Sequence, residues 1–226
     1  FAVLAIPAAI MLSLLGVARV LYPRPQDLTS APAQVRTQGL PRVFWIYVAG
    51  AALAAAGFAD FPLIAFHFQR AGTVSATLTP VFYAVAMAVS GTGSLVLGKL
   101  FDRAGIGVLI PLTVVSAVYA PLVFLGGFWA VLVGSALWGL GMGVQESLIP
   151  AAVAPMVAAG RRASAYGLFT GIYGTAWVAG SIVIGVLVSV SVSGLVAFCM
   201  VCELAVIPLI WIVRGHSATP AQQPGD

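Results

Sequence analysis

The sequence predicts an all-α membrane protein, a polytopic bundle of transmembrane helices. Hydrophobic residues make up 61% of the 226 residues and charged residues only 7%, whereas about 25% of an ordinary soluble domain is charged. The mean hydropathy is +1.08. The apolar residues also form long runs, and about 20 helical residues are enough to cross the hydrocarbon core of a bilayer.

Seven runs reach that length. In chain order they cover residues 1–22, 43–68, 73–98, 105–126, 128–158, 164–190 and 194–213. We expect helices because open strands would leave backbone groups unpaired in lipid. The first run lacks the basic start and the cleavage-like end of a signal peptide. Because the chain opens with Phe1 rather than Met, we expect that a preceding part of the same protein is missing.

The basic residues are divided unequally between the two sets of connections. The connections on one side of the membrane, together with Arg19, hold nine of the ten Lys and Arg residues. The connections on the other side hold only Arg70. The positive-inside rule therefore places residues 23–42 and 214–226 in the cytoplasm. The first of these segments is expected to be a linker and the second a disordered tail. This sidedness accounts for the excess of Lys and Arg over Asp and Glu, so we expect no nucleic-acid partner. We expect the protein to lie in a bacterial cytoplasmic membrane.

One short connection, "GKLFDRAG" at residues 98–105, holds three of the sixteen charged residues. It resembles the signature G-x-x-x-D-R-x-G of the major facilitator superfamily. The matching residues are Gly98, Asp102, Arg103 and Gly105, while Ile106 and Gly107 stand where the family usually has a basic pair. We expect a tight turn that uses the two motif glycines. Asp102 can accept hydrogen bonds from a helix N-terminus, so the motif could hold helices together in one conformation.

The resemblance implies the C-terminal part of a twelve-helix secondary transporter. Residues 1–22 would be the sixth helix, 23–42 the central linker and 43–213 the six-helix C-terminal half. Such a carrier works by alternating access around a site for a small-molecule substrate, and we expect protons as its coupling ions. Its partners would be the lipid bilayer and the missing N-terminal helices of the same protein. Whether it imports or exports is left open.

The predicted spans contain three acids, and each costs about 2.5–3.5 kcal/mol at the bilayer centre. Asp60 lies two residues before Pro62, which is expected to bend the second span. His67 follows on nearly the same face. We interpret Asp60 as a carrier of the coupling proton, with His67 nearer the outer mouth. The alternatives are a structural ion pair for Asp60 and an interfacial position for His67.

Glu146 lies near the centre of the fifth span, beside Gln145 and before Pro150. An interrupted helix with a central acid is typical of a transport site. In the resembled family the helices of Asp60 and Glu146 line the central cavity. A packing role is the alternative for Glu146, and it is the expected role of the third acid, Glu203.

The sixth span has two distinct faces. Four larger residues form a stripe that either faces substrate or packs, namely Tyr166, Thr170, Tyr173 and Trp177. Nearby lie small residues that would let another helix approach closely, namely Gly167, Gly171, Gly174, Ser181 and Gly185.

Other functions are less favoured by the sequence. We expect no cofactor, because no nucleotide-binding loop is present, and no metal, because Cys199 and Cys202 have no further ligand nearby. A passive facilitator is the closest alternative. A retinal-type receptor would need a lysine in the last span, but Lys99 is the only lysine. An intramembrane enzyme could use Asp60 and Glu146 as a pair, but no accompanying catalytic pattern is seen, so we expect a protein that is not an enzyme.

Overall fold

The computed structural model describes residues 5–21 and 39–217, and every regular element in these two ranges is a helix. The chain divides into two units, residues 1–35 and 36–226, which are described separately. The first unit contains α1, Ala5–Leu21, whose 17 residues correspond to the predicted first span. Most of the predicted linker, residues 23–42, and most of the predicted tail, residues 214–226, lie outside the described residues.

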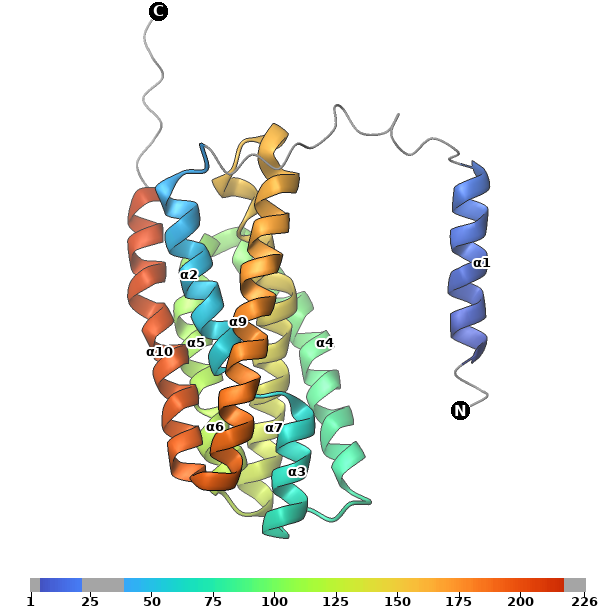
Figure 1. The fold of residues 1–226 in the computed structure, drawn as a ribbon, viewed down its shortest axis with the longest axis vertical. Coiled ribbons are helices and arrows are strands. Elements are labelled where there is room, and N and C mark those ends of the chain that lie inside the picture. The colour runs from blue at the N-terminus through green and yellow to red at the C-terminus, as the bar shows by residue number, and fades with distance from the viewer. Residues whose placement is uncertain (1–4, 22–38, 218–226) are drawn as a thin grey trace, which may run out of the picture. The chain divides into compact units, whose positions relative to one another are not determined.

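The second unit is a bundle of helices (Figure 1). Its main helices are α2 (Arg42–Gly57), α3 (Phe61–Ala71), α4 (Thr79–Ala104), α5 (Leu109–Ala117), α6 (Tyr119–Leu125), α7 (Phe128–Gly143), α9 (Arg162–Val190) and α10 (Val192–Ser217). Short elements join them: the 3₁₀ turns η3 (Gly105–Val108), η5 (Ala154–Met156) and η6 (Ala159–Arg161), the π-helical turn η4 (Val144–Leu148), and α8 (Ile149–Ala151).

Close contacts at glycines show which way the neighbouring helices run. Gly139 on α7 lies against the backbone of Ala86 on α4, and Gly143 lies against Ser90 one turn further along both helices, so α4 and α7 are parallel. Ser116 on α5 packs near Gly141, while Val123 on α6 packs near Gly134, so α5 and α6 run the opposite way. Similar contacts make α2 parallel to α9 and antiparallel to α10.

Five stretches of the described chain are long and apolar enough to cross a membrane. They are Arg42–Ala71, Thr79–Leu125, Phe128–Met156, Ala159–Val190 and Val192–Gly215. The second stretch has 47 residues and reverses direction at Gly105, whose φ of +65° is a conformation that glycine tolerates. With this reversal, the chain of the second unit runs along the bundle six times.

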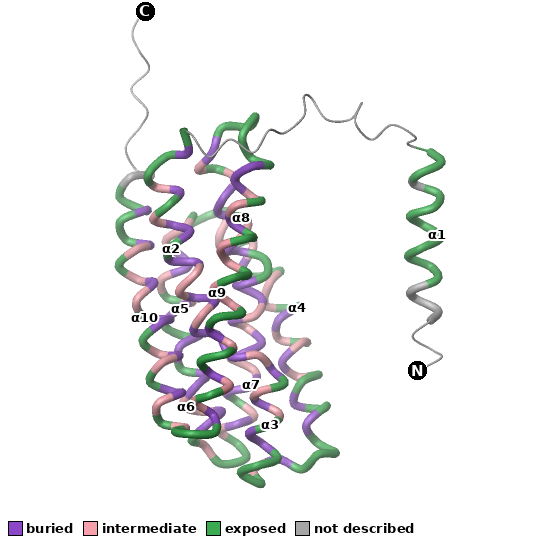
Figure 2. Tube along the Cα trace, in the orientation of Figure 1, coloured by how far each residue is buried: buried purple, intermediate pink, exposed green. Residues whose placement is uncertain are grey.

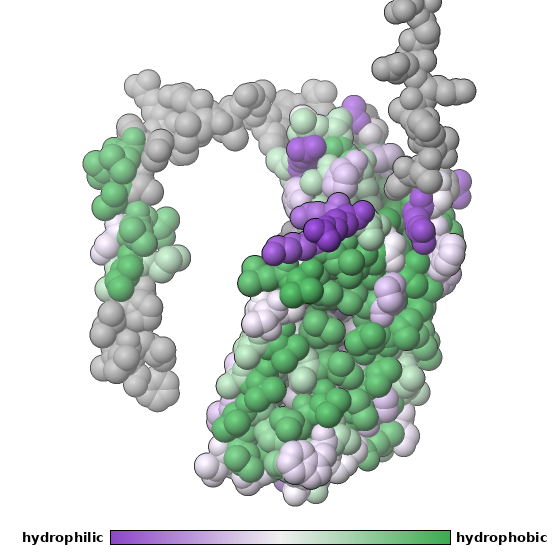
Figure 3. Space-filling view, turned by 180° about the vertical axis from the view of Figure 1, so that it is seen from behind, coloured by the Kyte–Doolittle hydropathy of each residue, from purple (hydrophilic) through white to green (hydrophobic). Residues whose placement is uncertain are grey.

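The outer surface of this unit is apolar. Large side chains such as Leu95 (73% exposed) and Val190 (76% exposed) face outward, and Figure 3 shows a broad hydrophobic surface below a band of hydrophilic side chains. A soluble monomer rarely exposes such a continuous apolar patch. Together with the five apolar stretches, this surface identifies a multi-pass membrane protein with an all-α fold.

Two predicted boundaries were wrong. The span 43–68 is not a single bent helix: α2 ends at Gly57 and α3 begins at Phe61. Pro62 lies in the first turn of α3, where its missing N–H breaks no helical hydrogen bond. The connection 99–104 is also helical, because α4 continues to Ala104 before the turn at Gly105.

Candidate functional site at the break between α2 and α3

The break between α2 and α3 is buried. Phe58 and Asp60 have extended backbone conformations, and the side chains of Phe58 and Ala59 are 0% exposed. Backbone N–H and C=O groups at such a buried break need hydrogen-bond partners within the protein, because no water reaches them there.

Side chains from other helices satisfy these backbone groups. The N–H of Ala59 donates to the Tyr119 hydroxyl over 2.8 Å, and the indole N–H of Trp138 donates to the Ala59 carbonyl over 2.8 Å. One turn earlier, Gln145 Nε2 donates to the carbonyl of Ala54 over 3.2 Å. The break is therefore built into the packing of α6, α7 and η4.

Asp60 lies at the end of the break and is held by α9. Trp177 Nε1 donates to Asp60 Oδ1 over 2.7 Å, and Ser181 Oγ donates to Oδ2 over 2.5 Å. Trp177 and Ser181 are four residues apart, so they lie on one face of α9. Both carboxylate oxygens thus accept hydrogen bonds from neutral donors on α9.

Asp60 also lines an open cleft with a volume of about 490 Å³. The other lining residues are Phe61, Pro62, Thr79, Pro80, Tyr83, Trp138, Met142 and Trp177. Sites for small organic molecules commonly have volumes of about 300–1,000 Å³, apolar and aromatic walls, and a few polar groups. The cleft has this character, and the Asp60 carboxylate is the acid that lines it.

The predicted residues Gln145 and Tyr173 contact each other, but Glu146 points elsewhere. The Tyr173 hydroxyl donates to Gln145 Oε1 over 2.6 Å. Glu146 is the next residue of the π-helical turn η4 and is exposed, and it does not line the Asp60 cleft. The structure therefore joins Asp60 with Trp177, and Gln145 with Tyr173, without bringing the two acids together.

His67 is buried away from the cleft. Its ring lies 5.1 Å from that of Phe124, between centroids, and it lines a separate depression of about 340 Å³ together with Arg70. In the described part of the chain, no three His, Cys, Asp or Glu side chains are grouped so that they could hold a metal ion.

The motif residues lie at the end of α4. Gly98 is inside the helix, Asp102 and Arg103 are exposed in its last turn, and Gly105 makes the turn that follows. Within the described part of the chain, the Asp102 carboxylate has no hydrogen-bond partner. An acid at the C-terminus of its own helix gains nothing from the helix dipole, so the structure leaves Asp102 available for a contact outside the described residues.

The two faces of α9 behave differently. Along the stripe, Tyr166 donates to the carbonyl of Pro150 over 3.2 Å, and Tyr173 and Trp177 make the contacts given above. Gly180, on the same side of α9 as Tyr173 and Trp177, packs tightly against the backbone of Ala56. A Cβ added at Gly167, Gly171 or Gly174 would meet no described atom within 4 Å, and Figure 2 shows how much of α9 is exposed.

Sequence reasoning missed Tyr119 and Trp138 altogether and assigned Ser181 only to a small packing face. A signal was present for Trp138: an indole N–H in the middle of a span needs an acceptor, unlike one at the interface. The sequence could not identify that acceptor, because the Ala59 carbonyl becomes free only when α2 ends.

No protein-family model matches the sequence. Curated proteins that align with it are "Uncharacterized protein Mb2288" of Mycobacterium bovis and "Uncharacterized protein MT2327" and "Uncharacterized protein Rv2265" of two Mycobacterium tuberculosis strains. Each is 33% identical over 225 residues, which cover 97% of this chain and 55% of the relative. The chain therefore spans about half the length of the curated relatives it matches.

Proposed function

We propose that the chain is the C-terminal part of a proton-coupled secondary transporter of small molecules, a carrier of the major-facilitator type that works by alternating access. The observation that carries the proposal is Asp60, which lies at a break in a membrane-spanning segment, is held by Trp177 and Ser181, and lines an open cleft. Interrupted helices with an acid are typical of transport sites.

Protonation of Asp60 would change its contacts with α9. As a carboxylate it accepts from Trp177 and Ser181 through its two oxygens. A protonated carboxyl uses one oxygen as a donor, and the indole of Trp177 cannot accept that hydrogen bond. Protonated at Oδ2, Asp60 would keep Trp177 as a donor to Oδ1 but would donate to Ser181 Oγ, so proton binding would reverse the direction of one of its two hydrogen bonds to α9.

The break provides a place where the helix direction can change. Three residues, 58–60, separate α2 from α3, and hinges are commonly a few residues at the ends of elements. An apolar, aromatic cleft with one acid fits a small apolar molecule that carries a positive charge or a hydrogen-bond donor. We propose this chemistry for the substrate.

The test needs the protein encoded by the whole reading frame, in sealed vesicles with an imposed pH gradient and a clamped membrane potential. The vesicles are offered a defined mixture of small metabolites and amphiphilic amines, and mass spectrometry measures what accumulates inside. We expect at least one compound to accumulate only with the wild type and only under the gradient. Asp60→Asn and Glu146→Gln should each abolish that accumulation, whereas the matched acid-to-amide control Asp226→Asn should not.

A passive facilitator is the competing function. It would equilibrate the same compound at the same rate with or without the pH gradient. Wild-type accumulation by both Asp60→Asn and Glu146→Gln under the gradient would contradict coupling through either acid.

A further inference from the structure

We propose that Glu203 on α10 and the small cavity that it faces form a buried site for one proton and one water molecule, distinct from the Asp60 cleft. The proposal does not depend on the transported substrate.

Glu203 is enclosed within the bundle and has an unsatisfied oxygen. Its side chain is 2% exposed, and its Oε1 has no hydrogen-bond partner in the described structure. The helix α2 approaches α10 closely here, because a Cβ added to Gly57 would meet the backbone N of Glu203 at 3.4 Å. Unsatisfied polar atoms are uncommon in protein interiors, and each one calls for an explanation.

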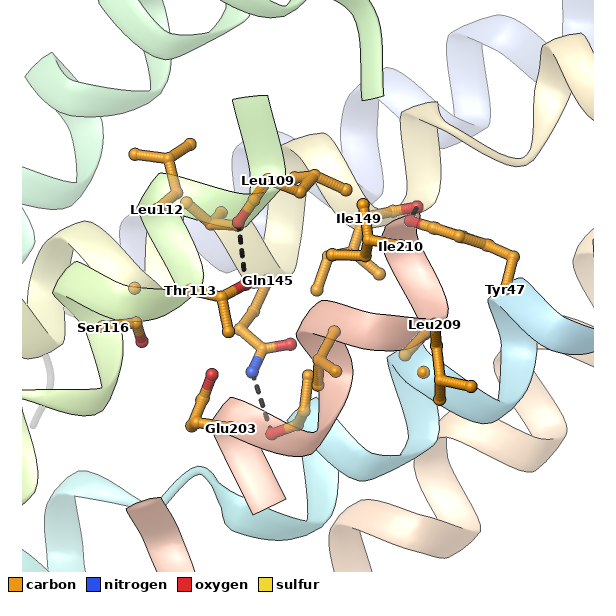
Figure 4. Close-up of a pocket in the computed structure, with 16 residues that line it drawn as sticks. Tyr47, Leu109, Leu112, Thr113, Ser116, Gln145, Ile149, Glu203, Leu209 and Ile210 are labelled. Atoms are coloured by element: carbon orange, nitrogen blue, oxygen red, sulfur yellow. Dashed lines mark hydrogen bonds between the residues drawn. The ribbon is translucent and has the colours of Figure 1, made fainter. Parts of the chain in front are cut away.

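The cavity beside Glu203 offers that explanation. Its volume of about 20 Å³ exceeds the roughly 10–15 Å³ that one water needs. Glu203, Gln145, Thr113 and Ser116 line it with polar groups (Figure 4). Gln145 donates one N–H to the carbonyl of Ala54, and Thr113 donates its hydroxyl to the carbonyl of Leu109 over 2.8 Å. The second N–H of Gln145 and the hydroxyl oxygen of Thr113 therefore remain for a water.

The surroundings favour a carboxyl group that carries its proton. Burial of an ionised carboxylate costs several kcal/mol unless a charged partner and hydrogen bonds compensate. None of the sixteen residues that line the cavity is Lys, Arg or His. Among residues 39–217, the other titratable groups that face Glu203 or its cavity are phenols and thiols, which supply no positive charge: Tyr47 of α2, Tyr119 of α6, Tyr173 of α9, and Cys199 and Cys202 of α10.

The Glu203 cavity is separate from the Asp60 cleft. The two have no lining residue in common. Phe58, which is fully buried, lies between them: its ring stacks 5.7 Å from that of Trp138 in the cleft wall, and a Cβ on Gly141 of the cavity wall would meet it at 2.8 Å.

The glutamate content of the chain permits a direct test, because Glu146 and Glu203 are its only two glutamates. The full chain is made by cell-free synthesis with glutamate ¹³C-labelled at the side-chain carboxyl, and is reconstituted into lipid nanodiscs. In Glu146→Gln, Glu203 is then the only labelled acid. In the matched variant Glu203→Gln, the exposed Glu146 is the only one. Infrared difference spectra are recorded across a pH titration, in H₂O and in H₂¹⁸O.

We expect Glu146→Gln to show, at neutral pH, the isotope-shifted carbonyl stretch of a protonated carboxyl, and Glu203→Gln to lack it. An O–H stretch that shifts in H₂¹⁸O should appear in Glu146→Gln and change in Glu203→Gln. If labelled Glu203 shows only carboxylate bands at neutral pH in folded protein, the proton site is overturned. A carbonyl band that vanishes on addition of Na⁺ would instead indicate a cation site, and the lack of any ¹⁸O-sensitive band would show a dry cavity. If Glu203→Gln does not fold, the Glu146→Gln sample still decides the question.

Discussion

Trp177 and Asp60 are 117 residues apart in the chain, yet the indole N–H of one donates to the carboxylate of the other over 2.7 Å. This hydrogen bond joins α9 to the place where α2 ends. It also connects the two stretches of sequence that we singled out for independent reasons, one for its intramembrane acid and the other for its aromatic stripe.

Trp177→Phe should destabilise the chain because it keeps a ring in place but removes the donor to Asp60. Hydrogen bonds to charged groups contribute about 1.5–3 kcal/mol, and we expect about 1–2 kcal/mol here because Asp60 is only half-buried. Unfolding of the detergent-solubilised chain by a denaturing detergent measures the change. Trp129→Phe, at a 75% exposed side chain, is the control and should have no resolvable effect.

Tyr119→Phe should lower the free energy of unfolding by more than the position of Tyr119 in an apolar run would indicate. The change leaves the buried N–H of Ala59 without its acceptor, and an unsatisfied buried group costs about 1–3 kcal/mol. Tyr83→Phe removes a hydroxyl from an exposed side chain and should stay within about 0.5 kcal/mol of the wild type. Equal stabilities for the two variants would contradict the role we assign to Tyr119.

Gly139→Ala should disrupt the packing of α7 against α4. The added Cβ would collide with the backbone of Ala86, which cannot move aside as a flexible side chain could. The control is Gly91→Ala on α4, where a Cβ meets no described atom within 4 Å, and which should be neutral or stabilising by about 0.5–1 kcal/mol. Thermal unfolding followed by circular dichroism distinguishes the two, and a tolerated Gly139→Ala would show that the helices can separate at little cost.

The all-α membrane class could be predicted because it depends on the length and hydropathy of the apolar runs, which are local properties. The break at residues 58–60 could not. Pro62 alone is compatible with either a bend or a new helix start, and the choice depends on Tyr119 and Trp138, which satisfy the Ala59 backbone from distant helices. For the same reason the sequence could place His67 on nearly the same face as Asp60 but could not identify Trp177 and Ser181, with which the structure pairs Asp60.

The orientation of the chain is a further prediction. The alternating directions of the helices put the turn at residues 72–78 and the turn at residues 158–162 at opposite ends of the bundle. By the positive-inside rule, a cysteine in Ala163→Cys should react only with reagent that enters the cytoplasm. A cysteine in Ala76→Cys should react with impermeant maleimide from outside. The wild type is the control, since Cys199 and Cys202 are buried, and the reverse pattern of labelling would invert the assigned topology.

Asp102→Asn should alter switching rather than folding. Because the Asp102 side chain is exposed and has no described hydrogen-bond partner, the unfolding free energy of the chain should change by less than about 0.5 kcal/mol. In the protein made from the whole reading frame, substrate affinity should be kept while turnover falls, since a motif that holds helices together in one conformation shifts populations and leaves the pocket intact. Loss of binding in folded protein, with unchanged rates of conformational exchange, would rule out this role for the motif.

The π-helical turn at Val144–Leu148 has a consequence for how this segment tolerates changes in chain length. A π-helical turn is an α-helix with one residue inserted. Deleting one residue there would convert the turn to regular α-helix and leave the faces of α7 and α8 aligned as before. The same deletion inside α9 would rotate everything beyond it by about 100°, given 3.6 residues per turn, and would carry Trp177 or Ser181 away from Asp60. A one-residue gap in a related sequence is therefore expected at η4 and not in α9.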